Sequence, residues 1–124
     1  MIIGIGIDSI RTERIERIIA LQGDRFLNRI FTSGEREYCS GKITTYESYA
    51  VRFSAKEAMF KALGRGWGEC GFTAVEVVSD SRGKPGILLH DSAKIFAEEL
   101  GVNRIVLSMT HDKWISSAVV ILEG

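Results

Sequence analysis

The sequence predicts an α+β fold of a single domain, residues 1–124, with helices packed over a largely antiparallel sheet. Three observations predict this class. An apolar run opens the chain as a strand, helical patterns then extend to residue 64, and the remainder is rich in β pattern with one further helix. The length allows one real hydrophobic core but is short of two domains, and the sequence contains no repeat, linker or low-complexity tract.

The first element is a glycine-spaced apolar run over residues 1–7, which fits a strand buried on both faces and ending at Asp8. Gly4 and Gly6 lie inside this strand and make no dinucleotide-binding fingerprint, because the third glycine is absent. They more simply permit the close packing of another backbone. An aspartate after a buried strand either forms a turn or points into a cleft as a ligand, and both interpretations stay open.

Two shorter helices are expected before the centre of the chain. Thr12 is expected to cap a helix that runs to residue 22 and is closed by Gly23. Residues 32–35 form a capping-box pattern, which predicts a short helix through residue 39.

A long helix is predicted from about residue 45 to Gly64, opened by a second capping-box pattern at residues 44–47. It is apolar nearly all round, as is typical of a core helix. Glu57 nevertheless projects between Phe53 and Phe60, and a buried carboxylate is costly unless something cationic meets it. That cation is either a basic residue of the same helix, in a structural ion pair, or a metal ion.

After a glycine-rich loop over residues 64–71, the pattern becomes β. This loop lets backbone approach a ligand closely or merely connects two elements. Strands are expected over residues 72–79, 86–89, 104–110 and 114–122, with Pro85 in a turn. Asp91 or Ser92 is expected to cap a helix ending at residue 100. The predicted order is therefore β-α-α-α-β-β-α-β-β.

Composition excludes several classes of function. The formal net charge is zero, so no overall field draws the protein to nucleic acid or to a membrane. Cys39 and Cys70 lack metal-ligand spacing and are most simply free thiols. The opening apolar run has no basic leader and is interrupted early by Asp8 and Arg11. We therefore expect a soluble cytoplasmic protein.

Asp8 and Glu57 are hard oxygen ligands that lie far apart in the sequence, each expected at the rim of a buried element. Two carboxylates, waters and substrate phosphates are the usual way of holding Mg²⁺. Lys61 follows one helical turn after Glu57, and Arg52 and Lys56 lie nearby, so cations for phosphate oxygens are close. The set suggests magnesium-dependent chemistry on a phosphate ester. His111, at a strand end, is either a second site residue or a surface turn residue, and His90 is a weaker candidate.

Arginines dominate the first third of the chain. The first 36 residues contain six arginines and no lysine. Arg14, Arg17 and Leu21 form one stripe of the first helix, which is either a docking face for an acidic helical partner or a solvated face. RNA is a poorer partner, because the net charge is zero and glutamates are interleaved on the same helix.

Three segments together resemble one family, the bacterial holo-[acyl-carrier-protein] synthases, which are the short class of 4′-phosphopantetheinyl transferases. The segments are Gly4-Ile5-Gly6-Ile7-Asp8, then Arg52-Phe53-Ser54-Ala55-Lys56-Glu57-Ala58 with Lys61-Ala62-Leu63-Gly64, and Ser108-Met109-Thr110-His111. The likeness runs essentially end to end. Departures from the family pattern fall at Ser9, Thr110 and Trp114, and none removes an expected metal ligand.

The resemblance implies transfer of the phosphopantetheine arm from coenzyme A to a serine of apo-acyl carrier protein, in support of fatty acid biosynthesis, with release of 3′,5′-ADP. Asp8 and Glu57 would hold Mg²⁺, or alternatively Mn²⁺, and Lys61 would bind the pyrophosphate as the third catalytic residue. The base is either Glu57 or a metal-bound water. The family also implies a homotrimer with active sites between subunits.

Further contacts follow from the same resemblance. The residues expected to bind coenzyme A are Arg52, Lys56, Lys61, Gly64, Gly66, Lys84, Pro85 and His111. Those expected to bind the carrier protein are Arg14, Arg17, Leu21, Phe26 and Arg29. Two rival hypotheses use the same residues differently: a metal-dependent phosphohydrolase that needs no protein acceptor, and a non-enzymatic trimeric scaffold whose buried charges are structural.

Overall fold

The computed structural model describes residues 1–66 and 68–124, so Trp67 of the predicted glycine-rich loop lies outside the described residues. The elements, in chain order, are β1 (Ile2–Arg11), α1 (Thr12–Gln22), α2 (Asp24–Ile30), α3 (Ser33–Ser40), α4 (Thr45–Leu63), the 3₁₀ helix η1 (Phe72–Ala74), β2 (Val75–Ser79), β3 (Pro85–Leu89), α5 (Asp91–Glu99), β4 (Arg104–His111) and β5 (Ile115–Glu123). The predicted α+β class is confirmed.

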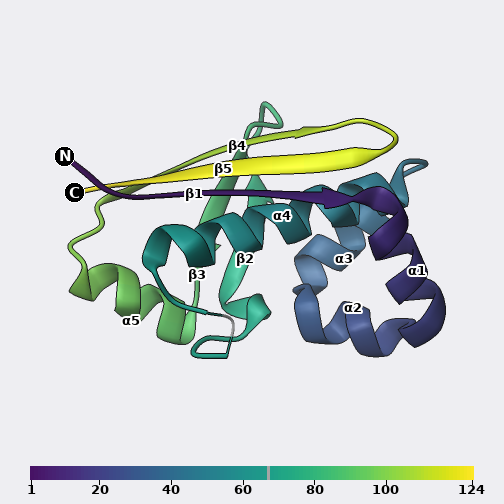
Figure 1. Cartoon of the computed structure of the whole chain (residues 1–124), viewed down its shortest axis with the longest axis horizontal. Helices are drawn as coiled ribbons and strands as arrows, with labels where there is room; N and C mark the ends of the chain where they lie inside the picture. The colour runs from purple at the N-terminus through teal and green to yellow at the C-terminus, as the bar shows by residue number, and fades with distance from the viewer. Residues whose placement is uncertain (67) are drawn as a thin grey trace.

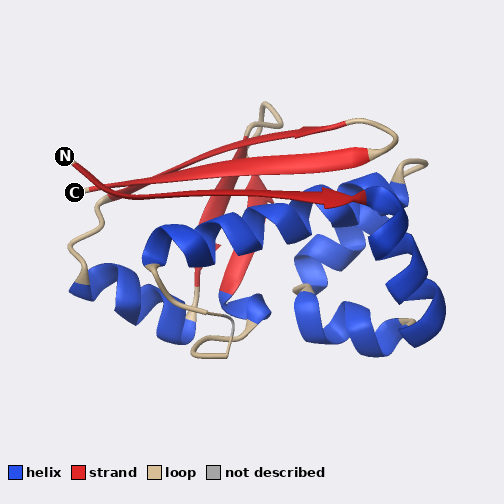
Figure 2. Ribbon diagram, viewed as in Figure 1, coloured by secondary structure: helices blue, strands red, loops and turns tan. Residues whose placement is uncertain are grey.

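The strands form two antiparallel units. One is a three-stranded sheet in the order β1-β5-β4, and the other is the β2-β3 hairpin. Helix α4 runs along the three-stranded sheet, with α1, α2 and α3 gathered at one end of the molecule and α5 at the other (Figure 1). Figure 2 shows the two chain ends side by side, where the Gly124 amide donates to the Met1 carbonyl at 2.9 Å.

Helix α4 is the core of the molecule, as its all-round apolar pattern predicts. Its buried side chains include Tyr49, Met59 and Phe60. It ends where Gly64 adopts a left-handed backbone and its amide donates to the carbonyls of the last turn. Its start differs from the prediction: among the described residues, the Thr44 side chain makes no capping hydrogen bond. The hydroxyl of Thr45 instead donates to the Lys42 carbonyl at 2.5 Å.

The capping box that opens α3 is confirmed. The Thr32 hydroxyl accepts from the Glu35 amide at 3.2 Å, and the Glu35 carboxylate accepts from the Thr32 amide at 2.9 Å. By contrast, Thr12 is the first residue of α1 rather than its cap, since the helix follows directly from β1. Its buried hydroxyl has no hydrogen-bond partner in the described part of the chain.

Strand β1 is longer and more exposed than predicted. It continues past Asp8 to Arg11, because those residues still pair with Ala118 to Ile115 of β5. Asp8 is therefore a strand residue rather than the residue after a strand. One face of β1 also lies open: Ile5 and Ile7 are 64% and 67% exposed, because α4 covers only the opposite face in this chain.

Other boundaries differ in ways that follow from local contacts. Helix α2 was not predicted; Gly23, at φ 55°, ends α1 and allows the chain to start another helix at once. The segment expected as a strand from residue 72 begins instead as η1. Pro85 is the first residue of β3 rather than part of the turn, and it pairs with Ser79. Helix α5 begins at Asp91 with His90 as its cap residue, so neither Asp91 nor Ser92 caps it.

Candidate active site

Two glycines bring β1 into direct contact with α4. A Cβ atom at Gly6 would lie 1.9 Å from the Ala58 carbonyl oxygen, and one at Gly4 would lie 2.2 Å from the Ala62 carbonyl oxygen. Only glycine permits this approach, which confirms the prediction of close backbone packing. Asp8 lies two residues beyond Gly6 on the same face of the strand, so its side chain points toward α4.

Asp8, Glu57 and Lys61 gather at this contact. The Lys61 Nζ lies 3.3 Å from Asp8 Oδ1 and donates to the Ile7 carbonyl at 2.9 Å. Partial burial raises the pKa of Glu57, the negative charge of Asp8 raises it further, and the charges of Lys61 and Arg14 oppose that rise. Glu57 is therefore close enough to Asp8 for the two carboxylates to repel each other.

This pair of carboxylates fits a magnesium ion. Oxygen donors are the ligands that Mg²⁺ prefers, and it usually takes one or two carboxylates and completes its shell with water and substrate phosphates. A cation between Asp8 and Glu57 would remove the repulsion that raises the pKa of Glu57. Among the described residues there is no group of three or more His, Cys, Asp or Glu side chains able to enclose a metal, so the remaining ligands would come from solvent and substrate.

Lys56 does not join this group, although it precedes Glu57 directly. Its side chain is fully buried, and its Nζ lies 2.7 Å from Glu35 Oε1. The same atom donates to the carbonyls of Phe72 and Val75 at 3.0 and 2.5 Å. An ammonium has three donors, and all three are occupied. The side chain of Lys56 therefore points into the core, with no donor left for the coenzyme A contact that the resemblance implies.

Arg52 is also packed within the protein. It is 5% exposed, and its guanidinium donates to the Ser48 carbonyl at 3.2 Å and lies 4.2 Å from the centre of the Tyr38 ring. The ammonium of Lys42 lies 4.5 Å from the same ring. Two cations thus contact the ring of Tyr38. Local pattern does not select Lys42, because its neighbourhood depends on how α3 packs against α4.

The other residues expected to bind coenzyme A lie on separate elements. His111 ends β4, with its Nδ1 3.6 Å from Glu47 Oε1 in the first turn of α4. Lys84 and Pro85 belong to the β2-β3 turn, where Asp80 Oδ1 accepts from the Lys84 amide at 2.9 Å. Gly64 and Gly66 begin the loop after α4. In the part of the chain that the structure describes, we find no hydrogen bond or ion pair joining these residues to Asp8, Glu57 or Lys61.

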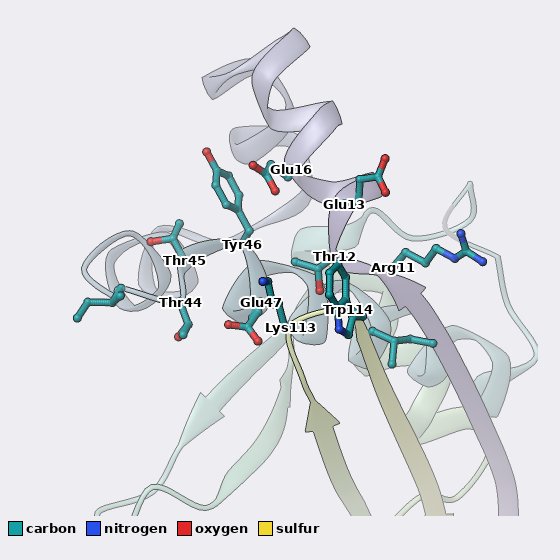
Figure 3. Close-up of a pocket in the computed structure, with 12 residues that line it drawn as sticks. Arg11, Thr12, Glu13, Glu16, Thr44, Thr45, Tyr46, Glu47, Lys113 and Trp114 are labelled. Carbon is teal, nitrogen blue, oxygen red and sulfur yellow. The ribbon is translucent and has the colours of Figure 1, made fainter.

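A large cavity lies near the beginnings of α1 and α4, beside the β4-β5 turn (Figure 3). Its volume is about 740 Å³, and its walls include Thr12, Tyr46, Glu47 and Trp114. Its described lining contains none of the residues predicted to hold metal or coenzyme A. Glu47 connects the cavity to the residues predicted to bind coenzyme A, because it lines the cavity and also faces His111.

The arginine stripe of α1 is exposed, as a docking face requires. Arg14 faces solvent, Leu21 is 79% exposed, and Arg17 makes an exposed ion pair with Glu13 at 2.6 Å. Arg29 is exposed on α2. Phe26 is not available to a partner: it is buried, and its ring packs edge-on against Phe31 with centroids 6.1 Å apart. The side of α2 that bears Phe26 faces the core, so the predicted carrier contact finds no exposed side chain at this position.

Comparisons with known proteins identify the family of this chain. Residues 4–117 match the sequence model of the 4′-phosphopantetheinyl transferase superfamily. The chain is 46% identical, over the full length of both chains, to holo-[acyl-carrier-protein] synthase of Solibacter usitatus (strain Ellin6076).

Solved structures show the same fold. The crystal structure of holo-[acyl-carrier-protein] synthase from Neisseria meningitidis matches all of both chains with a TM-score of 0.92 and 34% identity. The Bacillus anthracis str. Ames synthase, solved in complex with coenzyme A (3′,5′-ADP), matches 98% of this chain and 96% of its own with a TM-score of 0.80 and 38% identity. The chain therefore belongs to the 4′-phosphopantetheinyl transferase superfamily, as an enzyme of the holo-[acyl-carrier-protein] synthase type.

Within the described residues, no helix combines the length and the apolar character that a membrane span requires.

Proposed function

We propose that this enzyme transfers the 4′-phosphopantetheine group of coenzyme A to a serine hydroxyl of apo-acyl carrier protein, with Mg²⁺ as cofactor, in support of fatty acid biosynthesis in the cytoplasm. The observation that carries the proposal is the meeting of Asp8 on β1 with Glu57 and Lys61 on α4. The relatives bear the name of this activity, and one was solved with coenzyme A bound.

Asp8 and Glu57 are the residues that would hold the metal. Bound there, Mg²⁺ would polarise the phosphoryl centre and neutralise charge on the pyrophosphate. Lys61 is the cation of the site: its side chain is about half exposed at the rim, so it can turn from Asp8 toward a phosphate oxygen. We assign it to the pyrophosphate, where it would stabilise the charge that develops on the leaving 3′,5′-ADP.

The acceptor serine must lose a proton as its oxygen attacks the phosphorus. Glu57 is a carboxylate of the site, and a carboxylate within reach of the attacking hydroxyl can act as its general base. We therefore propose the Glu57 carboxylate as the group that accepts this proton, with water as the alternative acceptor.

Docking of the carrier is proposed on the exposed face of α1 formed by Arg14, Arg17 and Leu21, extended by Arg29 of α2. Arginine grips carboxylates with a planar fork, which suits an acidic carrier protein. The charge of Arg14 is among those that act on Glu57, which supports this face of α1 as the docking surface.

We further propose a homotrimer with the active sites between subunits. Support comes from the open face of the three-stranded sheet, where Ile5 and Ile7 point away from α4 and are mostly exposed. A shallow hollow of about 210 Å³ on this sheet is lined by Ile7, Met109 and Val119 among others. Apolar sheet faces of this kind are ordinarily covered. In such a trimer, His111 and the Lys84-Pro85 turn of one subunit could serve the Asp8 site of another.

The proposal is tested by incubating the protein with apo-carrier, coenzyme A and Mg²⁺ and measuring the intact mass of the carrier. We expect the carrier to gain one phosphopantetheine. An unmodified carrier, together with release of inorganic phosphate, would instead identify a phosphohydrolase and overturn the transfer.

A further inference from the structure

Lys56 and Glu35 form an ion pair sealed inside the protein. Both side chains have no exposed surface, and Lys56 Nζ lies 2.7 Å from Glu35 Oε1. Glu35 also accepts from the amides of Thr32 at 2.9 Å and Val77 at 2.8 Å. With the carbonyls of Phe72 and Val75 on Lys56, the pair joins α3 and α4 to η1 and β2.

Stability alone is a poor explanation for this arrangement. Moving two charges out of water costs several kcal/mol per ion, and apolar replacements of a buried pair are often as stable or more stable. Apolar side chains, however, cannot make directional hydrogen bonds to backbone groups. The ammonium and the carboxylate together hold four backbone groups at fixed positions, so the pair determines where those backbone segments lie.

The segments held in this way are continuous in the chain with residues predicted to bind coenzyme A. Phe72 follows the glycine loop, residues 64–71, whose first residue caps the end of α4. Lys56 therefore fixes the far end of a loop that starts on its own helix. The Phe72 ring adds to this anchoring, because it stacks on Phe53 at 5.5 Å and meets Phe60 edge-on at 5.3 Å between centroids.

The other anchored segment is β2, which leads directly to the Lys84-Pro85 turn. Val75 and Val77 are buried residues of β2, and both have a backbone group bound by the pair. The hairpin thus takes its position relative to α4 from the same two side chains. Of the predicted backbone contacts of coenzyme A, Gly64 and Gly66 precede the Phe72 anchor in the chain, and the Lys84-Pro85 turn follows the anchors on β2.

We propose that Lys56 and Glu35 are positioning residues for coenzyme A: they touch no ligand, but hold Phe72, which directly follows the loop after α4, and the β2-β3 hairpin in the positions that coenzyme A binding requires. The inference rests on the proposed function in that coenzyme A is the substrate. It replaces a direct role for Lys56 in ligand binding with an indirect one.

The test is a variant that removes both charges and keeps the helix cap, Lys56→Met combined with Glu35→Gln, since glutamine also serves at this position of a capping box. We expect it to fold with one cooperative thermal transition. Its KM and Kd for coenzyme A should rise about tenfold or more, with kcat at saturating coenzyme A changed by less than about threefold. Met59→Leu, a volume-conserving change at a fully buried position of α4, should leave both constants unchanged.

A second variant, Lys56→Arg, keeps the charge but cannot place one nitrogen between Glu35 and two carbonyls. It should weaken coenzyme A binding in the same direction. If the double variant binds coenzyme A as the wild type does, the pair is only structural and the inference is overturned. If neither variant folds, the pair is a stability determinant and the inference is equally overturned. Failure of the wild-type protein to bind coenzyme A would contradict the proposed function instead.

Discussion

At the scale of one residue, Glu57 belongs to the site, but its charged form lowers the stability of the folded protein. Its carboxylate is half-buried beside another carboxylate, and both circumstances disfavour its charged form. Because its pKa in the folded protein lies above the ordinary value, the folded state holds a proton more tightly than the unfolded state does. Stability from this group is therefore greatest at low pH and is lost as pH rises from about 4.5 through the raised pKa.

We predict that Glu57→Gln makes the metal-free protein more stable at neutral pH, because the neutral amide removes the repulsion from Asp8. Transfer activity should fall by about 10²–10³-fold, as is usual when one stabilising group of a catalytic site is lost. Thermal unfolding in EDTA, measured from pH 4 to pH 8 (about the range in which a perturbed carboxyl titrates), provides the check. The melting-temperature gain should shrink toward acidic pH. A variant less stable than wild type at pH 7 would contradict the assignment.

At the scale of elements, the contact between β1 and α4 determines how the residues of the site are positioned. We predict that Gly6→Ala destabilises the protein by about 1–3 kcal/mol or more, since the new methyl group would overlap the Ala58 carbonyl. Denaturant unfolding measures the loss. Gly41→Ala is the matched control: its backbone is right-handed helical and its nearest atom is 3.8 Å away, so it should be neutral or slightly stabilising. Equal stability of both variants would mean that β1 can move off α4 at no cost.

Helix α1 carries the second prediction at this scale. Arg14→Glu should weaken binding of apo-carrier by about tenfold, the size of effect expected from one well-placed interface charge, with little change in coenzyme A affinity. Calorimetry with each ligand separates the two. Lys94→Glu, an equal charge reversal on the exposed face of α5, should leave carrier binding unchanged. Equal losses of carrier and coenzyme A affinity for Arg14→Glu would remove α1 as the docking face.

These elements also show what the sequence could and could not predict. Period and composition were enough to identify α4 and the glycine-spaced strand β1, because both depend on residues close together in the chain. The glycines also indicated a close backbone neighbour, but not that α4 would supply it. The direction in which the Lys56 side chain points depends on its ion pair with Glu35, which lies on another helix. Periodicity predicts which face of α4 carries Lys56, but not which residue packs against that face. Helix α2 lies outside the prediction for a similar reason: Gly23 indicates a helix stop, whereas the second helix that begins at once is held by core packing of its buried side.

At the scale of the whole molecule, the open sheet face is the feature that one chain leaves unexplained. We predict that the wild type has the mass of three chains by light scattering and that Ile5→Asp shifts it to one chain, because a carboxylate on a buried apolar interface is strongly disfavoured. Activity should fall with the trimer. Ile95→Asp, at an exposed apolar position of α5, is the control and should stay trimeric. A monomeric wild type would contradict the assembly.

The central claim is that Asp8 and Glu57 together hold the magnesium ion on which transfer depends. The most direct measurement follows carrier mass after EDTA treatment, with Mg²⁺ then added back, for wild type and for Asp8→Ala. We predict no transfer in EDTA, full recovery of the wild type with Mg²⁺, and no recovery of a folded Asp8→Ala variant. Full transfer by the wild type in EDTA, or by Asp8→Ala at any Mg²⁺ concentration, would contradict the account.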